Sequence, residues 1–188
     1  NRCWRHYWPT LELDNNSTVL VPLCGKSKDM VWLAQLGHQV IGVELSETAV
    51  REFFDELEVT PQIDTLGSFT RYSAANITLL AGDFFALPAD YLASVTAVYD
   101  RASLIALPPG MRDDYAALLT RRLPAKVKTL LITFEYRPGA AEGPPFSIDE
   151  NEVRRLFSHR CDIDALDSQY FDLRGVVSTE HVFRLIYR

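Results

Sequence analysis

Short apolar runs alternate with longer amphipathic segments along the chain from Ser17 onward. The short runs are rich in β-branched residues and predict five strands, at residues 18–22, 39–44, 77–81, 97–100 and 129–136. The longer segments predict helices at about residues 27–36, 46–57, 110–123 and 149–158. Strands that alternate with helices in this way are typical of βαβ units built around a parallel sheet.

Three stretches depart from this alternation. Residues 61–72 include Gly67 and have a mixed pattern, which predicts an irregular insert or a small hairpin. Residues 136–146, YRPGAAEGPPF, contain too much Pro and Gly for anything except a loop. The last two apolar runs, 162–167 and 181–187, predict a final strand pair, antiparallel because the connection is too short for a parallel crossover. We find no internal repeat and expect a single domain over residues 1–188.

The composition is that of an ordinary globular chain. Of 188 residues, 47% are hydrophobic and 23% are charged, and the net charge is −6. No dense run of Lys and Arg interleaved with aromatic residues occurs, so nucleic acid is not an expected partner. No apolar run approaches the roughly 18–20 residues that span a bilayer, so a membrane is not expected either. We expect a monomer whose partner is a small molecule.

The cysteines and histidines give little sign of chemistry. Cys3, Cys24 and Cys161 are an odd number with no CxxC motif, which predicts neither a disulfide framework nor a zinc cluster. The histidines are too dispersed for a metal site. Cys24 has no evident His or Asn partner, so packing behind Gly25 is favoured over nucleophilic catalysis. A reducing cytoplasm fits this cysteine content best.

The residues just after each strand are the candidates for a site, because a doubly wound sheet binds ligands beyond the carboxyl ends of its strands. The stretch VLVPLCGKSKDM ends like a P-loop, but Leu20 stands where the second P-loop glycine belongs. Gly25 instead allows the backbone to approach a ligand at the next helix. Glu44 ends the second strand, where an acidic residue accepts hydrogen bonds from ribose hydroxyls. The alternative for Glu44 is a surface charge near the helix start at Ser46.

The third strand is followed by GDFF. Asp83 could accept a hydrogen bond from an exocyclic amine, and Phe84 could form a wall for a purine; equally, Asp83 could only cap a short helix. Phe85 is more typical of the core. Gly25 alone, in place of G-x-G-x-x-G, argues against a nicotinamide dinucleotide. Together these features favour the S-adenosylmethionine methyltransferase plan, an α/β fold with a doubly wound, mostly parallel sheet.

The segments VLVPLCGKSKDMVWLAQLGHQVIGVELSETAV, GDFFAL, YDRASLIALPPGMRDDYA and GPPFSI resemble the thiopurine S-methyltransferase family of bacterial type, over essentially the whole chain. The resemblance implies a Rossmann-like class I methyltransferase fold with a seven-stranded sheet whose last strand is antiparallel. It implies S-adenosyl-L-methionine as cofactor, S-adenosyl-L-homocysteine as product, and the sulfur of thiopurines or other aromatic and heterocyclic thiols as acceptor. The family's N-terminal cofactor-covering segment has no counterpart in this sequence.

Carried over by position, the resemblance assigns cofactor-binding residues beside Gly25. Leu23 and Glu44 match contacts to the methionine and ribose parts of the cofactor. Asp83 and Phe84 match residues that flank the adenine.

The resemblance also assigns residues to the acceptor. Arg101, in YDRAS, matches the family's substrate-side arginine. We expect it to be the catalytic residue and to bind both acceptor and cofactor, because its fixed charge could lower the acceptor's pKa and orient it. Asp100 could steady this guanidinium, or the two could be a structural pair that closes the fourth strand. Arg174 most nearly matches a second family arginine, in an alignment ambiguous by one residue. Phe146, in GPPF, lies where an aromatic acceptor could be covered, although a rigid turn needs no function.

Two alternatives remain open. The same transferase could methylate selenium or tellurium oxyanions, because bacterial relatives of the family are associated with metalloid methylation. From a different class, the chain could be a non-catalytic nucleoside-binding regulatory domain, which would bind the cofactor without turnover.

Overall fold

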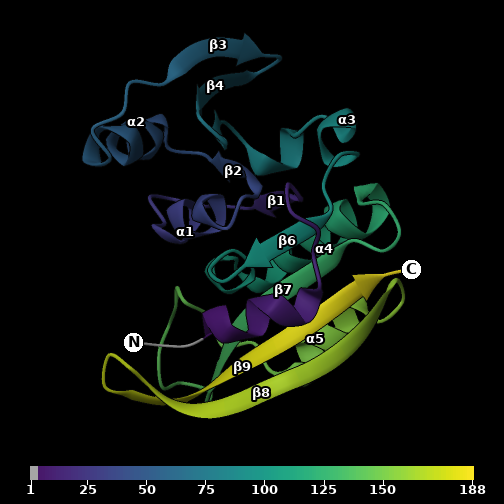
Figure 1. The fold of residues 1–188 in the computed structure, drawn as a ribbon. Coiled ribbons are helices and arrows are strands. Elements are labelled where there is room, and N and C mark those ends of the chain that lie inside the picture. The colour runs from purple at the N-terminus through teal and green to yellow at the C-terminus, as the bar shows by residue number, and fades with distance from the viewer. Residues whose placement is uncertain (1–3) are drawn as a thin grey trace. The chain divides into compact units, whose positions relative to one another are not determined.

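A computed structural model describes residues 4–188 of the chain, so Cys3 lies outside the described residues. The chain divides into two compact units, and each contains its own strands and helices (Figure 1). One unit runs from Leu13 to Tyr99. The other, here called the second unit, joins the N-terminal segment that ends at Glu12 to Asp100–Arg188.

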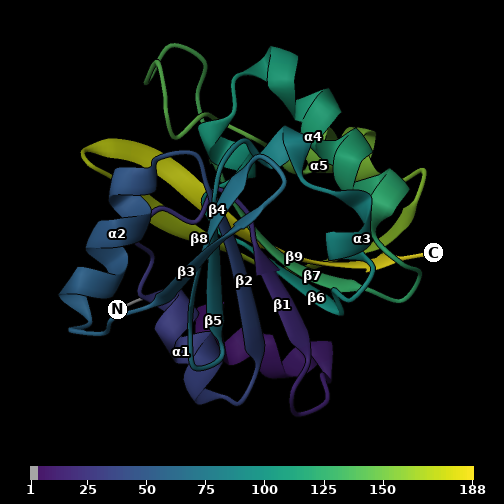
Figure 2. The ribbon, with the colours of Figure 1, turned by 90° about the horizontal axis from the view of Figure 1, so that it is seen from above.

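Four parallel strands form the centre of the Leu13–Tyr99 unit, in the order β5, β2, β1 and β6 (Figure 2). Their bounds are Thr18–Val21 for β1, Gln39–Glu44 for β2, Ile77–Ala81 for β5 and Ala97–Asp100 for β6. The structure therefore confirms the first four predicted strands. Val19 and Leu20 of β1 are both fully buried although they point to opposite faces, which explains the unbroken apolar run.

Two helices, α1 (Asp29–Gln35) and α2 (Glu47–Glu56), pack against β2 and β5. Ser46 is the N-cap of α2, as the sequence predicts, and its hydroxyl accepts a hydrogen bond from the backbone N–H of Ala49 at 3.3 Å. Gly37 ends the α1 region in the left-handed conformation, with φ +92°. The residues that α2 buries recur at helical spacing: Val50, Phe53 and Phe54.

Residues 61–72, predicted as an irregular insert or a small hairpin, contribute a hairpin that extends the sheet. β3 (Gln62–Leu66) pairs antiparallel with β4 (Phe69–Ala74), and β4 pairs antiparallel with β5. Gly67, with φ +58°, lies in the turn. Four of the five β3 residues are exposed, so this strand has little apolar pattern to reveal it. Two short elements follow β5: η2 (Phe84–Ala86) and α3 (Ala89–Leu92).

Three antiparallel strands form the sheet of the second unit, in the order β7, β9 and β8. Their bounds are Lys128–Tyr136 for β7, Cys161–Leu173 for β8 and Val176–Tyr187 for β9. The antiparallel final pair is confirmed, but both strands are far longer than 162–167 and 181–187. Only Cys161 is fully buried along β8, so most of that strand lacks the alternation that predicts strands.

The β8–β9 connection is a two-residue turn. Arg174 has φ +54° and Gly175 has φ +90°, the pair of left-handed residues that a tight hairpin favours. Residues 4–188 therefore contain nine strands rather than seven, because the 61–72 segment adds two. The α/β class is unchanged.

Two helices, α4 (Pro109–Arg122) and α5 (Glu150–Phe157), lie side by side in the second unit (Figure 1). Asp149 is the N-cap of α5, and its carboxylate accepts a hydrogen bond from the backbone N–H of Glu152 at 2.8 Å. Two 3-10 segments complete the unit: η1 (Trp4–Leu11), which packs on β7, and η3 (Leu104–Ala106). Within residues 4–188, every helix is too short or too polar to cross a membrane.

Candidate functional site

The turn after β1 has an unusual backbone. Leu23 has φ +43° and Gly25 has φ +51°, so both residues adopt the left-handed conformation. A Cβ added at Gly25 would meet no atom within 4 Å, so the backbone there faces open space. A left-handed leucine is unfavourable by itself and persists only where its surroundings hold it, which is common at ligand-binding turns.

The carboxylate of Glu44 holds this turn. Its Oε2 accepts a hydrogen bond from the Gly25 N–H at 2.9 Å, and its Oε1 accepts one from the Ser46 N–H at 2.9 Å. Glu44 thus joins the turn after β1 to the start of α2. A carboxylate has about four lone-pair sites, so two remain for hydroxyl donors on this half-buried side chain.

Asp83 and Phe84 lie at the end of β5, in the same unit as Glu44. The Asp83 carboxylate accepts a hydrogen bond from the Phe85 N–H at 3.0 Å, which caps η2, as one of the two sequence interpretations proposed. Asp83 is exposed and keeps acceptor capacity toward solvent. The ring of Phe84 is buried and meets the Phe85 ring edge-on at 6.0 Å. Neither arrangement tests a role in adenine binding.

The second unit contains a cavity of about 500 Å³ that brings together two of the predicted acceptor residues. Arg101 reaches it from the segment after β6, and Arg174 reaches it from the turn between β8 and β9. The cavity is lined by Arg101, Ala102, Ile105, Ala106, Phe134, Pro144, Pro145, Phe171, Asp172, Leu173, Arg174 and Glu180.

Two aromatic rings form a wall of this cavity. Phe134 of β7 and Phe171 of β8 are stacked, with ring centroids 4.9 Å apart and planes inclined by 22°. No sequence signal marks this pair, because the two residues meet only through the register of β7, β9 and β8. Glu180 of β9, which pairs with Phe134, also lines the cavity. Its carboxylate has the opposite charge to the two arginines.

Phe146, predicted to cover an aromatic acceptor, is not among the residues that line the cavity. Its ring packs so closely on Gly143 that a Cβ there would come within 2.4 Å of it. Its N–H donates to the carbonyl of Ile105 at 2.6 Å. The cavity is instead lined by the two prolines that precede it, Pro144 and Pro145.

Asp100, at the end of β6, is buried and shapes the segment that carries Arg101. Its carboxylate accepts hydrogen bonds from the Tyr115 hydroxyl at 2.6 Å and from the N–H groups of Ser103 and Leu104 at 3.0 and 3.3 Å. Burial raises the pKa of Asp100, and burial beside Asp100 raises the pKa of Tyr115. Asp100 therefore stabilises the turn after β6 by accepting hydrogen bonds from the backbone of that turn and from Tyr115 of α4.

The cysteines of the described chain are buried thiols. Burial, reinforced by the nearby Glu44 carboxylate, raises the pKa of Cys24 far above that of a reactive thiol. Burial also raises the pKa of Cys161 to about 12. Within residues 4–188, no group of three or more metal-binding side chains gathers at one place.

A second hollow, of about 630 Å³, lies beside the end of β7 in the same unit. It is lined by residues 135–138, Ala140 and residues 175–179. No residue predicted from the sequence to bind cofactor or acceptor lines it. We therefore take the Arg101 cavity as the acceptor-side candidate.

Comparison with known proteins gives one consistent result. The family model described as thiopurine S-methyltransferase (TPMT) matches residues 1–182. A thiopurine S-methyltransferase of Pseudomonas fluorescens strain Pf0-1 is 48% identical over 165 residues, which cover 88% of this chain and 76% of that protein. A probable thiopurine S-methyltransferase of Yarrowia lipolytica is 44% identical over 185 residues, which cover 95% of this chain and 86% of that protein.

Solved structures with the same fold are more distant in sequence. A SAM-dependent methyltransferase of Methanosarcina mazei has a TM-score of 0.71 at 16% identity, covering 96% of this chain and 98% of that one. A Burkholderia thailandensis 1,6-didemethyltoxoflavin-N1-methyltransferase, solved with 1,6-didemethyltoxoflavin and S-adenosylhomocysteine, has a TM-score of 0.67 at 15% identity. That match covers 100% of this chain and 78% of the other. These likenesses confirm the predicted class of fold.

Proposed function

The chain belongs to the thiopurine S-methyltransferase family, and from this premise we propose that it transfers a methyl group from S-adenosylmethionine to the sulfur of thiopurines or other aromatic thiols. The observation that carries the acceptor class is the cavity lined by Arg101, Arg174 and the stacked rings of Phe134 and Phe171. Stacked rings suit a planar aromatic acceptor, and guanidinium groups suit one that carries negative charge.

The residues after β1, β2 and β5 have the chemistry to hold the cofactor. Gly25 presents backbone to open space beside Leu23, and Glu44 keeps lone pairs for the ribose hydroxyls. Asp83 is exposed and can accept from the adenine amine while it caps η2. Phe84, which is buried, would contribute the edge of an apolar surface rather than an open ring face.

The bound cofactor would supply a methyl group on a sulfonium, whose sulfur leaves as a neutral thioether and needs no acid from the protein. What the chain has to supply is position, and good alignment of two reactants contributes up to roughly 7–11 kcal/mol. Arg101 would hold the acceptor as its thiolate, because a fixed positive charge beside a thiol lowers the thiol's pKa. A guanidinium is always protonated in a protein and has no lone pair to accept a proton, so the acceptor's proton would leave through water. Arg174 would orient the acceptor from the hairpin turn.

The direct test is transfer of labelled methyl from S-adenosylmethionine to 6-mercaptopurine by the full-length protein. Methylated thiopurine is the expected product. Selenite and tellurite serve as parallel acceptors, because the same two arginines would suit an oxyanion. Product from the metalloids alone would replace the acceptor class, and cofactor binding without any product would favour the regulatory alternative.

The setting of the reaction is also part of the proposal. We propose a monomer acting in the cytoplasm, because buried reduced cysteines suit a reducing compartment and nothing in the acceptor cavity calls for a second chain. Sedimentation of the purified protein at micromolar concentration tests the monomer. A stable dimer would contradict it without affecting the chemistry.

A further inference from the structure

Arg112 is a buried arginine on the first turn of α4, and no sequence motif assigned it a role. Its side chain is only 7% exposed. A guanidinium cannot lose its positive charge in a protein, and burying that charge without partners is strongly unfavourable. Its surroundings must therefore supply hydrogen bonds, charge or an aromatic face.

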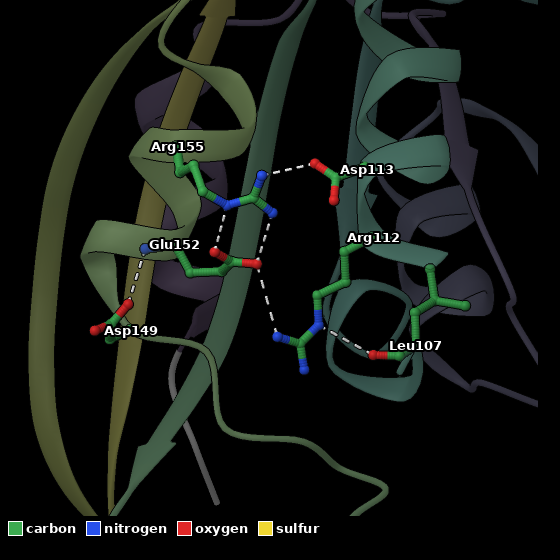
Figure 3. A network of polar contacts seen from close by, with 6 residues as sticks. All are labelled: Leu107, Arg112, Asp113, Asp149, Glu152 and Arg155. Carbon is green, nitrogen blue, oxygen red and sulfur yellow. Dashed lines mark hydrogen bonds and ion pairs between the residues drawn. The ribbon is translucent and has the colours of Figure 1, made fainter. Parts of the chain in front are cut away.

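Three segments of the chain supply those partners. The Nε of Arg112 donates to the carbonyl oxygen of Leu107 at 3.1 Å, and its Nη1 lies 3.7 Å from Oε1 of Glu152 (Figure 3). The guanidinium carbon also lies 5.8 Å from the ring centroid of Phe146, within the range of a cation–π interaction. Arg112 thus contacts the segment after β6, the loop after β7 and helix α5.

Two of these segments form walls of the Arg101 cavity. Leu107 directly follows η3, which contributes Ile105 and Ala106 to the lining. Phe146 directly follows the lining prolines, and its N–H donates to the carbonyl of Ile105 at 2.6 Å. Arg112 does not line the cavity itself. It contacts the residue that follows each wall, Leu107 and Phe146, and so its one side chain can hold the two walls at a fixed separation.

The carboxylate of Glu152, opposite Arg112, is held in place by the exposed Arg155. Glu152 accepts hydrogen bonds from Nε and Nη2 of Arg155 at 2.7 and 3.0 Å, and Arg155 also bonds to Asp113 at 2.7 Å (Figure 3). These hydrogen bonds hold the pKa of Glu152 below its ordinary value, so it stays ionised. Arg154, on the same helix, is exposed and pairs with Glu150 at 2.7 Å rather than with Glu152, which makes it a matched control.

We infer that Arg112 is a positioning residue for the acceptor, which fixes the Leu104–Leu107 segment and the Gly143–Phe146 loop against each other. The inference rests on the proposed function, because that function gives the cavity its ligand. Arg112 touches no reacting atom and acts through Phe146 and Leu107. Its loss should therefore widen or loosen the cavity while leaving the residues after β1, β2 and β5 as they are.

The first test needs no acceptor. Hydrogen exchange of the Phe146 amide, followed by NMR in the ligand-free protein, reports whether the bond to Ile105 persists. Arg112→Met keeps an unbranched apolar stem without the charge, and it should speed this exchange by about tenfold or more, the effect of losing a typical hydrogen bond or two. The amide of Ile132, inside β7, should change less than about twofold. The control Arg154→Met should leave Phe146 near the wild-type rate.

The second test separates acceptor from cofactor. In the full-length protein, Arg112→Met should raise the KM for 6-mercaptopurine about tenfold while the KM for S-adenosylmethionine stays within about twofold. Arg112→Lys keeps the charge opposite Glu152 but not the flat fork, and it should fall between wild type and Met. If Arg112 acts through Phe146, the double variant Arg112→Met/Phe146→Leu should be no worse than the worse single variant.

Each outcome decides the role. Unchanged Phe146 exchange in a folded Arg112 variant, or equal losses of acceptor and cofactor affinity, would show that Arg112 only supports the fold. If the Met variant does not fold, Arg112→Lys decides the question by the same two readouts. A wild-type protein that binds cofactor but methylates no thiol would contradict the proposed function, while the exchange result would still decide whether Arg112 fixes the loop.

Discussion

Glu44 illustrates how one side chain can serve both the fold and a ligand. The sequence assigned it to the ribose, with a surface charge near Ser46 as the alternative. In the structure its two oxygens accept the Gly25 and Ser46 amides, and the Ser46 contact agrees with the alternative. The ribose assignment stays a prediction. Glu44 also has a structural role in joining two turns, and an experiment must separate this role from ribose binding.

Replacing Glu44 should therefore produce two measurable losses. Glu44→Ala should lower the free energy of unfolding by about 1–3 kcal/mol, because the two backbone amides lose their acceptor. It should also weaken S-adenosylhomocysteine binding by on the order of tenfold or more, because a hydrogen bond to a charged group contributes roughly 1.5–3 kcal/mol. Urea unfolding without ligand measures the first effect, and calorimetry measures the second.

Glu44→Gln is the matched control. It keeps a carbonyl acceptor for one amide but lacks the charge. Unchanged calorimetric affinity in both variants would remove Glu44 from the cofactor site and leave it as a connector of two turns.

Arg101 should show the opposite separation. Because it lines the cavity that we propose for the acceptor, Arg101→Ala should lower turnover of 6-mercaptopurine by about tenfold or more while S-adenosylhomocysteine affinity stays within about twofold. Rapid-mixing single-turnover kinetics and calorimetry measure the two quantities. Arg174→Ala, at the other side of the same cavity, provides a comparison of the two guanidinium groups. Equal losses of turnover and cofactor affinity in Arg101→Ala would show a structural role instead.

At the scale of elements, the contact between α4 and α5 should make stability depend on pH. Arg155 is the main cause of the lowered pKa of Glu152. A carboxyl whose pKa is lower in the folded state adds stability above its ordinary pKa of 4.5, and this contribution is lost as pH falls through the folded-state pKa.

The variant Glu152→Gln should thus be less stable than wild type at pH 6–7, by about 1 kcal/mol or less. The difference should shrink below pH 4.5, where the wild-type carboxyl takes up its proton. Urea unfolding at a series of pH values measures this. In an Arg155→Met background the pH-dependent part should be smaller, and a difference that persists unchanged at pH 3 would argue against the ionised pair as its source.

The elements also show what sequence patterns can and cannot predict. β2, β5 and β6 have the predicted bounds. Buried parallel strands appear in a sequence as short apolar runs, and polar residues at each end of the run mark where the strand begins and ends. β3 and most of β8 are exposed, so their side chains are free to be polar and no apolar pattern remains to predict them.

The candidate site divides in the same way. Arg101 and Arg174 could be found from strand ends and a family motif, and the structure brings both to one cavity. Phe134 and Phe171 could not, because their stacking depends on the β7–β9–β8 register. Arg112 could not either: nothing in its local sequence distinguishes a buried arginine from an exposed one on the same helix.

At the scale of the whole molecule, a bound cofactor should raise the melting temperature. A ligand present at 100 times its dissociation constant stabilises the folded state by about 2.7 kcal/mol. For a chain of this size each kcal/mol shifts the midpoint by about 2–4 °C, so S-adenosylhomocysteine should raise it by about 5–10 °C. Differential scanning calorimetry measures the shift.

Adenosine at the same concentration is the control, because it lacks the amino-acid part. The absence of any shift with S-adenosylhomocysteine would contradict the cofactor assignment. A single calorimetric transition would also support the expectation of one domain, which the division into two compact units leaves as a prediction.

The length of the β8–β9 hairpin sets where Arg174 stands at the cavity that we propose for the acceptor. Its turn carries Arg174, so the lengths of the two strands set how far along the sheet that guanidinium stands. Each residue added to a strand advances the tip by about 3.4 Å and reverses the face to which side chains point. Lengthening both strands by one residue would therefore turn the tip over, and lengthening both by two would restore its face about 7 Å further out. Under the proposed function, the position of Arg174 would change in steps of about 7 Å, so relatives with longer or shorter hairpins should take acceptors in separate size classes rather than over a continuous range.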